Sequence, residues 1–272
     1  MEIVRLGQGV DKTKRFDPLA IERTLDAVAK FSDEIGRRGV TAIRFCATSA
    51  TRDAENRALF VDGVKGILGI EPEVISGDEE ARLSFLGATR EMHPSDGPFL
   101  VVDIGGGSTE FVFGNETVLA ARSVNIGCVR MSERHLSMSP ASSTAIEAAI
   151  ADIDQAIKSA AEIVPFNEAR TLIAVAGTAT TVAAAALELD SYDRYAIHLS
   201  RIPAAKVAEV SKRFLSSSRE EISSLGYMHP GRVDVIAAGA LVLDRVMKAT
   251  GASEFVASES DILDGMAWSL AN

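Results

Sequence analysis

Two carboxylates flank a run of glycines near the middle of the chain, in the segment Asp103-Ile104-Gly105-Gly106-Gly107-Ser108-Thr109-Glu110. An apolar run over residues 99–102 precedes it, and Phe111-Val112-Phe113 follows. Apolar segments on both sides of a glycine cluster, with no helical period after it, predict a strand, a tight turn and a second strand. Successive glycines let backbone N–H groups converge on one concave site, which favours a bound anion such as phosphate.

Asp103 and Glu110 place two negative charges beside this turn. Carboxylates repel a phosphate group unless a cation lies between them. Carboxylate oxygens suit a hard divalent cation, and Mg²⁺ commonly divides its coordination between carboxylates and phosphate. The pattern therefore predicts that the turn binds phosphate through a divalent metal ion, with Mg²⁺ as the expected one.

Other glycine-rich phosphate motifs do not match this turn. A P-loop places Gly-Lys-Ser/Thr at the start of a helix, and this turn has neither the lysine nor the helix. A dinucleotide fingerprint requires a glycine where Glu110 stands, and again a helix. The alternative that stays open is a hairpin turn without a ligand, although three adjacent glycines cost more backbone entropy than a turn requires.

A second acidic segment, residues 77–82, opens a predicted helix with Glu79 and Glu80 in its first turn. Acidic residues at this position suit the helix dipole, which would explain both without any catalytic role. The helical wheel separates them, because Glu79 faces leucines whereas Glu80 shares its face with Ser84 and Gly87. A carboxylate on a face of small residues has room beside it for a water molecule or a ligand.

A third segment, residues 174–181, is a buried strand that ends at Gly177-Thr178 and continues as an Ala-rich helix. The start of such a helix offers free N–H groups to an anion. An ordinary helix cap by Thr178 is the alternative.

Farther upstream, Arg130 and Arg134 lie four residues apart on a predicted helix. They could hold distal phosphates or could simply be solvated.

Composition fits an intracellular enzyme. The chain has 272 residues, of which 47% are hydrophobic and 24% charged, which is typical of globular proteins. The net charge of −10 argues against a general nucleic-acid or membrane binder. The N-terminus has no signal-peptide core, and no apolar stretch approaches the length that spans a membrane. We therefore expect a cytoplasmic protein whose polyanionic ligand is held by local arginines and a metal ion.

Strands and helices alternate along the chain, which predicts an α/β fold in two domains. The clearest linker is Pro94-Ser95-Asp96-Gly97-Pro98, so we expect one domain over residues 1–97 and another over residues 98–258. Strands are expected at residues 2–10, 41–47, 72–76, around the glycine turn, at 172–176 and at 254–257. The main helices are expected to start at residues 18, 48, 79, 128, 142, 178, 204, 232 and 261.

The chain resembles the Ppx/GppA phosphatases, which include exopolyphosphatases and guanosine pentaphosphate phosphohydrolases, within the actin-like ATPase superfamily. Each matching segment is moderately specific, and all of them in this order are highly specific. The matching segments are Ala47-Thr48-Ser49-Ala50-Thr51-Arg52, residues 75–82, 103–112 and 125–130, Gly177-Thr178-Ala179-Thr180, and residues 232–239.

This resemblance implies two ribonuclease-H-like domains with the active site in the cleft between them, and a closing helix over residues 259–272 that returns toward the first domain. It makes Glu80 the general base that activates water, and Asp103 and Glu110 the carboxylates that orient metal and water. Gly177 and Thr178 would bind phosphate from the opposite side of the cleft. The terminal phosphate would be held by Gly105, Gly106, Gly107 and Ser108.

The start of the chain differs from the usual pattern of the family. Family members usually begin with a strand and a turn of the Asp-x-Gly-Ser/Thr-Asn-Ser kind, the first phosphate motif, before the strand that corresponds to residues 2–10. We therefore expect a first domain that is truncated at its N-terminus, and a natural protein that begins farther upstream.

The activity implied is release of orthophosphate from the end of inorganic polyphosphate, by metal-assisted attack of water. Hydrolysis of guanosine pentaphosphate is the alternative, because both reactions use the same terminal-phosphate chemistry. A non-catalytic phosphate or alarmone sensor is a third possibility, suggested by the departure at the start of the chain. The resemblance further implies a homodimer.

Overall fold

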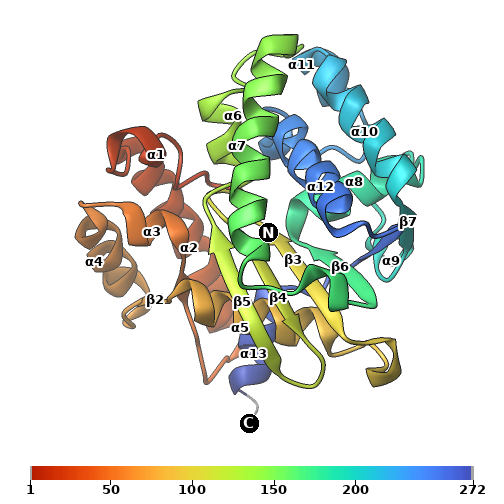
Figure 1. Cartoon of the computed structure of the whole chain (residues 1–272). Coiled ribbons are helices and arrows are strands. Elements are labelled where there is room, and N and C mark those ends of the chain that lie inside the picture. Colours follow the sequence, from red (N-terminus) through yellow and green to blue (C-terminus); the bar gives the residue numbers. More distant parts are fainter. Residues whose placement is uncertain (1, 271–272) are drawn as a thin grey trace. The chain divides into compact units, whose positions relative to one another are not determined.

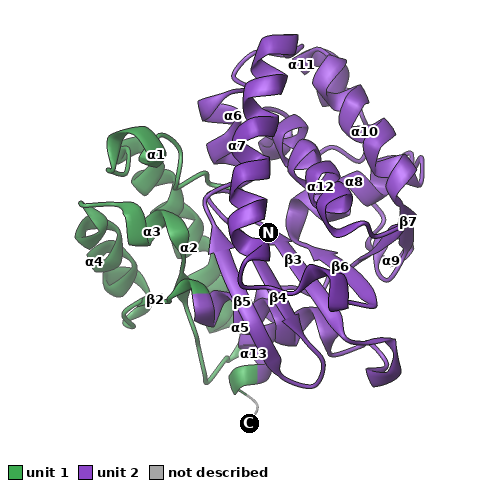
Figure 2. Ribbon diagram, viewed as in Figure 1, with its two compact units in different colours: residues 1–77, 269–272 green, residues 78–268 purple. Residues whose placement is uncertain are grey.

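The computed structural model describes residues 2–270. The chain divides into two compact units, which we call the first unit (residues 1–77 with 269–272) and the second unit (residues 78–268) (Figure 2). Residues 94–98, which we predicted to be a linker, lie inside the second unit, where Pro94–Asp96 forms a short 3-10 helix. The domain limits 1–97, 98–258 and 259–272 stay a prediction.

The first unit is mostly helical. Its longest helix begins as predicted, because Asp17 Oδ1 accepts hydrogen bonds from the N–H groups of Leu19 and Ala20, and it ends at Gly39 in a left-handed conformation. The core includes Phe16 and Phe60, whose rings meet edge to face at 6.0 Å. The elements are α1 (Val10–Thr13), α2 (Pro18–Arg38), β1 (Cys46–Ala47), α3 (Ser49–Asp53), α4 (Arg57–Leu68) and β2 (Glu73–Val74) (Figure 1).

The strand predicted over residues 2–10 is wrong. Arg5 and Gly9 have φ angles of 54° and 75°, and the Gln8 N–H closes a turn on the Arg5 carbonyl. Left-handed residues break an extended segment, so this region turns into α1 instead. The strand predicted over residues 41–47 shortens to β1, which pairs in parallel with β2 over two residues.

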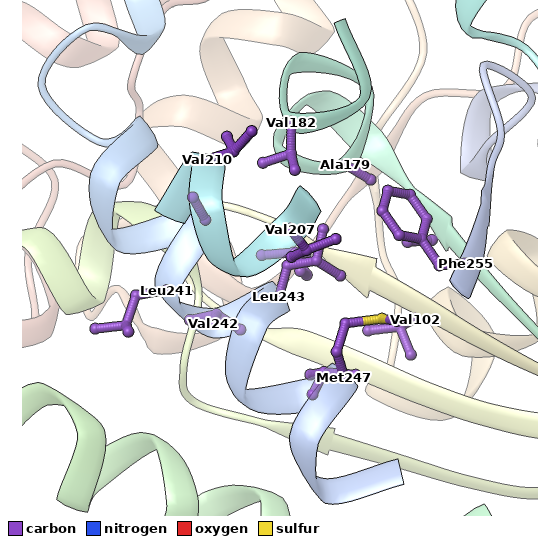
Figure 3. Close-up of a cluster of buried hydrophobic side chains, with 14 of the residues drawn as sticks. Val102, Ala179, Val182, Val207, Val210, Leu241, Val242, Leu243, Met247 and Phe255 are labelled. Atoms are coloured by element: carbon purple, nitrogen blue, oxygen red, sulfur yellow. The ribbon is translucent and has the colours of Figure 1, made fainter. Parts of the chain in front are cut away.

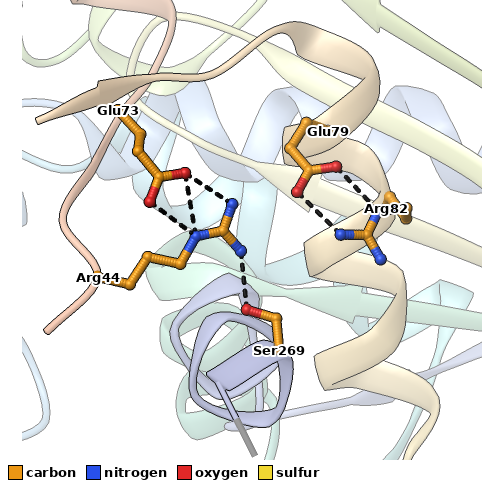
Figure 4. A network of polar contacts seen from close by, with 5 residues as sticks. All are labelled: Arg44, Glu73, Glu79, Arg82 and Ser269. Atoms are coloured by element: carbon orange, nitrogen blue, oxygen red, sulfur yellow. Dashed lines mark hydrogen bonds and ion pairs between the residues drawn. The ribbon is translucent and has the colours of Figure 1, made fainter. Parts of the chain in front are cut away.

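One polar contact holds the end of the chain within the first unit. The Arg44 guanidinium pairs with Glu73, with Nη2 2.9 Å from Oε2, and its Nη1 donates to Ser269 Oγ at 2.8 Å (Figure 4). Arg44 lies just before β1 and Glu73 opens β2. The contact therefore ties both short strands to the last residues of the described chain.

The second unit is built on a six-stranded sheet in the order β5-β4-β3-β6-β8-β7. The glycine turn joins β3 to β4 as an antiparallel hairpin, as predicted, and β6 and β8 run parallel to β3. The strands are β3 (Phe99–Ile104), β4 (Thr109–Gly114), β5 (Val118–Val124), β6 (Thr171–Val175), β7 (Arg201–Pro203) and β8 (Glu254–Ala257). The helices are α5 (Gly77–Thr89), α6 (Cys128–Arg134), α7 (Ser143–Ala161), α8 (Ala176–Ala186), α9 (Arg194–Ile197), α10 (Ala204–Ser216), α11 (Arg219–Ser223), α12 (Ile236–Thr250) and α13 (Ile262–Leu270).

Helices cover both faces of this sheet. On one face, Val102 of β3 packs in a large core with side chains from α10 and α12, among them Val207 and Leu243 (Figure 3). On the other face, Phe85 of α5 packs against apolar residues of β3, β4, β6 and β8. This second face is the one that carries Asp103, because side chains alternate along β3 and Val101 belongs to the same cluster.

Helices α5 and α13 approach each other through glycines. A Cβ on Gly87 would lie 1.9 Å from the Asp261 carbonyl oxygen, and a Cβ on Gly265 would lie 1.9 Å from the Leu83 carbonyl oxygen. Only glycine permits this backbone contact, which brings Asp261 to the helix that carries Glu80.

Over residues 2–270, no helix is both long and apolar enough to cross a membrane.

Candidate active site

Asp103 and Glu110 stand directly opposite each other in the β3–β4 hairpin. Opposed residues of an antiparallel pair place their side chains on the same face of the sheet. Both carboxyl groups are buried, with 6% of Asp103 and 1% of Glu110 exposed. The hairpin thus concentrates two like charges at the end of an otherwise apolar face, in the position that the sequence pattern predicted.

The glycine turn is held by the first turn of α6. The carbonyl oxygen of Gly105 accepts from the N–H of Cys128, and that of Gly106 accepts from the N–H of Val129, both at 2.9 Å. A Cβ on Gly127 would lie 2.3 Å from the Gly106 oxygen, so a side chain there would push the turn away. These hydrogen bonds fix the orientation of the turn, with its carbonyl oxygens pointing toward α6.

Arg130 and Arg134, which looked equivalent in the sequence, differ in the structure. Arg130 is only 5% exposed, and its Nε donates to the Gly107 carbonyl oxygen at 2.7 Å. The Arg134 side chain is 30% exposed and pairs with Asp152 at 3.1 Å. Arg130 therefore supports the glycine turn, whereas Arg134 belongs to a more exposed ion pair.

Helix α5 presents Glu80 and Ser84 on the face that packs against the sheet. Glu80 is 8% exposed, and Ser84 Oγ donates to Asp103 Oδ2 at 2.5 Å. Glu79 turns away, with 29% of its side chain exposed, and forms a two-bond ion pair with Arg82 (Figure 4). The separation of the two glutamates predicted from the helical wheel is confirmed.

The environment of Asp103 favours its protonated form. The pKa of this carboxyl is raised to about 7, chiefly by burial, against the opposing hydrogen bond from Ser84, and the nearby charges of Asp261 and Glu80 contribute to the rise. Asp261 was missed in the sequence, where only its place after the strand at 254–257 hinted at a role. Its own pKa is raised, first of all by burial.

Glu110 shows the same effect. Its pKa is raised to about 8, chiefly by burial and further by repulsion from Glu80 and then from Asp103, while hydrogen bonds from Ser123 and Ser108 oppose the rise. The Ser123 Oγ donor lies 2.6 Å from Glu110 Oε1. The charges of Glu80, Asp103 and Glu110 thus act on one another, and a cation among them would relieve the repulsion.

The second predicted phosphate segment follows β6, the strand next to β3. Asp103 pairs with Val175 in the parallel β3–β6 ladder, so the glycine turn and the start of α8 leave the sheet at the same edge. The two segments are also linked through α6, because the side chains of Thr178 and Cys128 both lie against Gly239 of α12. The structure therefore brings Gly177 and Thr178 to the same end of the sheet as the carboxylate pair.

Arg232 lies directly against this segment. A Cβ on Gly177 would come within 2.2 Å of Arg232 Nη2, and Arg232 Nη1 donates to Thr181 Oγ1 at 3.0 Å. In the sequence Arg232 only opens the matching segment 232–239, and nothing there indicated a contact with Gly177. Tertiary packing puts its positive charge at the start of α8.

The carboxylates suit a cation that takes few protein ligands. Within residues 2–270, no group of three or more His, Cys, Asp or Glu side chains converges closely enough to hold a metal ion by itself. Mg²⁺ commonly binds through one or two carboxylates, with water and substrate phosphate completing its shell. Asp103 and Glu110 therefore fit Mg²⁺ and do not form an all-protein metal cage.

The sequence profile of the Ppx/GppA phosphatase family matches residues 1–272. The chain belongs to this family. It is similar to exopolyphosphatase 2 of Mycobacterium tuberculosis, with 43% identity over 99% of this chain and 87% of that protein. A crystal structure of an exopolyphosphatase-like protein superposes with a TM-score of 0.96 at 43% identity, covering 99% of this chain and 89% of that one.

The chain is also similar to guanosine-5'-triphosphate,3'-diphosphate pyrophosphatase of Photobacterium profundum, with 36% identity over 48% of this chain and 27% of that protein. Membership of the Ppx/GppA family makes this chain a hydrolase that acts on phosphoric anhydrides. Its α/β fold is of the actin-like ATPase type, as predicted.

Proposed function

We propose that this Ppx/GppA protein is an exopolyphosphatase, which releases orthophosphate from the end of inorganic polyphosphate by attack of water. The observation that carries the proposal is the meeting, at one edge of the sheet, of two buried carboxylates, a glycine turn and the Gly177-Thr178 segment. The 43% identity to a protein named exopolyphosphatase supports polyphosphate as the substrate.

Glu80 is the proposed general base. Its carboxylate lies on the same face of α5 as Ser84, which contacts Asp103, and its charge acts on both Asp103 and Glu110. A base in this position can accept the proton of a water molecule beside the terminal phosphate. Glu79 is engaged with Arg82 and more exposed, so it is the weaker candidate.

The two glycine-containing segments are the proposed phosphate ligands. The carbonyl oxygens of Gly105, Gly106 and Gly107 accept hydrogen bonds from α6, and the Gly105 N–H donates to the Ser108 carbonyl oxygen within the turn, so the N–H groups that follow Gly105 are the ones that can turn to a ligand. The terminal phosphate is held there, by Gly105, Gly106, Gly107 and Ser108. Gly177 and Thr178 contact phosphate from the start of α8, with Arg232 supplying positive charge.

Asp103 and Glu110 are the proposed ligands of Mg²⁺. The bound cation supplies positive charge that neutralises the transferred phosphoryl group. The residues of this chain orient the phosphate and the water and accept the proton, and the short hydrogen bonds to the two carboxylates keep them in place.

Guanosine pentaphosphate is the alternative substrate, and similarity to the pyrophosphatase of Photobacterium profundum favours it. Both substrates end in a phosphoanhydride, so the same groups serve either one. A homodimer and a cytoplasmic location stay predictions from the family resemblance, and light scattering tests the first of them.

The test is phosphate release from polyphosphate and from guanosine pentaphosphate, with and without Mg²⁺. Glu80→Gln should lower kcat by about 10²-fold or more, as loss of a general base does. Glu79→Gln is the matched control, because it removes a neighbouring carboxylate that is paired with Arg82. Binding of polyphosphate without any phosphate release would make the chain a sensor and overturn the proposal.

A further inference from the structure

Two serine hydroxyls contact the carboxylate pair from opposite sides. Ser84 Oγ of α5 donates to Asp103 Oδ2 at 2.5 Å, and Ser123 Oγ of β5 donates to Glu110 Oε1 at 2.6 Å. Both hydrogen bonds are short, and they become about twice as strong as neutral ones when the carboxylates are ionised, which is the form that binds a cation. Each serine therefore fixes one oxygen of one carboxylate.

The strand register makes this arrangement continuous. Asp103 stands opposite Glu110 in the β3–β4 ladder, and Glu110 stands opposite Ser123 in the β4–β5 ladder. Directly opposed residues share a face, so the three side chains form one row across three adjacent strands. Ser84 closes the row at its Asp103 end, from the helix that packs on this face.

Packing alone does not explain Ser84. Its neighbours on the inner face of α5, among them Ala81 and Phe85, pack against apolar side chains of the sheet, and Ser84 itself is 0% exposed. A serine inside a helix often bonds back to the carbonyl one turn earlier, whereas Ser84 donates across to the sheet. A buried hydroxyl costs stability unless it has such a partner, so the hydrogen bond accounts for its presence.

We propose that Ser84 and Ser123 are positioning residues that hold Asp103 and Glu110 in the orientation that binds the divalent cation. The inference rests on the proposed function for the identity of the cation site. Ser84 holds one oxygen of Asp103, and Ser123, together with Ser108, holds Glu110, so the rotation of both carboxylates is limited and the lone pairs that these hydroxyls do not engage face the cation. Ser84 also lies one helical turn after Glu80, so its contact with Asp103 fixes the distance between the base and the cation site.

The test measures cation binding directly, by calorimetric titration of Mg²⁺ and Mn²⁺ in the presence of inorganic phosphate. We expect Ser84→Ala and Ser123→Ala each to weaken binding by about 10–100-fold, the usual effect of losing a partner of a metal-binding carboxylate. Ser84→Cys fills the same space with a weak donor and should behave like Ser84→Ala. Ser123→Thr keeps the hydroxyl on a strand and should bind within about threefold of the unchanged chain.

Ser211→Ala, at a buried serine of α10, is the matched control and should leave cation binding unchanged. Circular dichroism checks that each variant is folded. If Ser84→Ala does not fold, the comparison of Ser123→Ala with the unchanged chain tests the inference. Any of three results would overturn the inference. These are unchanged cation affinity in both alanine variants, full cation affinity in Ser84→Cys, and no cation binding by the unchanged chain. Phosphate release, measured separately, decides the proposed function, so the two can fail independently.

Discussion

The guanidinium group of Arg232 lies against the backbone of Gly177, so that a Cβ on this glycine would come within 2.2 Å of Nη2. Thr181, one helical turn farther along α8, accepts a hydrogen bond from Nη1 of the same arginine. The start of α8 thus carries a fixed positive charge in addition to its own free N–H groups. This contact makes the absence of a side chain at Gly177 a requirement of the site.

Gly177→Ala should displace the Arg232 guanidinium, because the far end of a flexible side chain moves more easily than the backbone. Displacement removes a positive charge from the start of α8, so we expect KM for polyphosphate to rise by about tenfold, with a smaller change in kcat. The measurement is steady-state phosphate release. In an Arg232→Ala background the same substitution should have little further effect, and additive effects in the double variant would contradict the proposed contact.

Arg130→Ala and Arg134→Ala should lower the free energy of unfolding by different amounts, although the two arginines lie on the same helix. Loss of the buried Arg130 leaves the Gly107 carbonyl oxygen without its donor and opens a cavity beside the glycine turn. We expect a loss of about 2–4 kcal/mol in the free energy of unfolding, together with weaker phosphate binding. Arg134→Ala breaks a partly exposed ion pair and should cost less than about 1 kcal/mol. Denaturant unfolding measures both, and equal losses would refute the distinction.

Stability without a cation should fall as the pH rises. The pKa values of Asp103 and Glu110 are raised to about 7 and about 8 in the folded chain, from ordinary values of 3.8 and 4.5. The folded chain therefore holds more protons than the unfolded chain between about pH 4 and pH 8, and the free energy of unfolding contributed by this pair decreases through that window. Mg²⁺ binds the ionised pair, so it should restore stability most strongly at the alkaline end.

Thermal unfolding from acidic to alkaline pH, with and without Mg²⁺, measures this effect. Asp103→Asn and Glu110→Gln each remove one titrating group, so each should flatten the dependence and reduce the Mg²⁺ response. A Tm of the metal-free chain that rises through the same window, with no change in either variant, would show that the pair does not behave as described.

Gly87→Ala tests the contact between α5 and α13. The new Cβ would lie 1.9 Å from the Asp261 carbonyl oxygen, which is backbone and cannot rotate away. We expect a loss of about 1–3 kcal/mol in the free energy of unfolding, typical of overpacking, and lower phosphate release because Asp261 moves relative to Asp103. Gly66→Ala in α4 is the control, because nothing lies within 4 Å of its Cβ position. That substitution should stabilise the chain by up to about 1 kcal/mol, and a similar result at Gly87 would contradict the close contact.

The hairpin and the main helices of the second unit could be predicted because their signals are local. Glycines between apolar runs specify the β3–β4 turn, and once the turn is placed the register puts Asp103 opposite Glu110. Strand β8 was predicted with the bounds that the structure gives, Glu254–Ala257. The prediction of a strand over residues 2–10 was wrong, because the apolar content of this segment does not indicate the left-handed backbone at Arg5.

The sequence by itself determined which groups could do chemistry: the carboxylates at Asp103 and Glu110, the glycines between them, and the face of α5 that bears Glu80. Only the tertiary structure decided which arginine supports the glycine turn, which one lies on Gly177, and which serines contact the carboxylates. Those choices depend on segments that meet through packing across many intervening residues. Periodicity and spacing report the neighbours of a residue along its own helix or strand, and they carry no information about which distant side chain completes its hydrogen bonds.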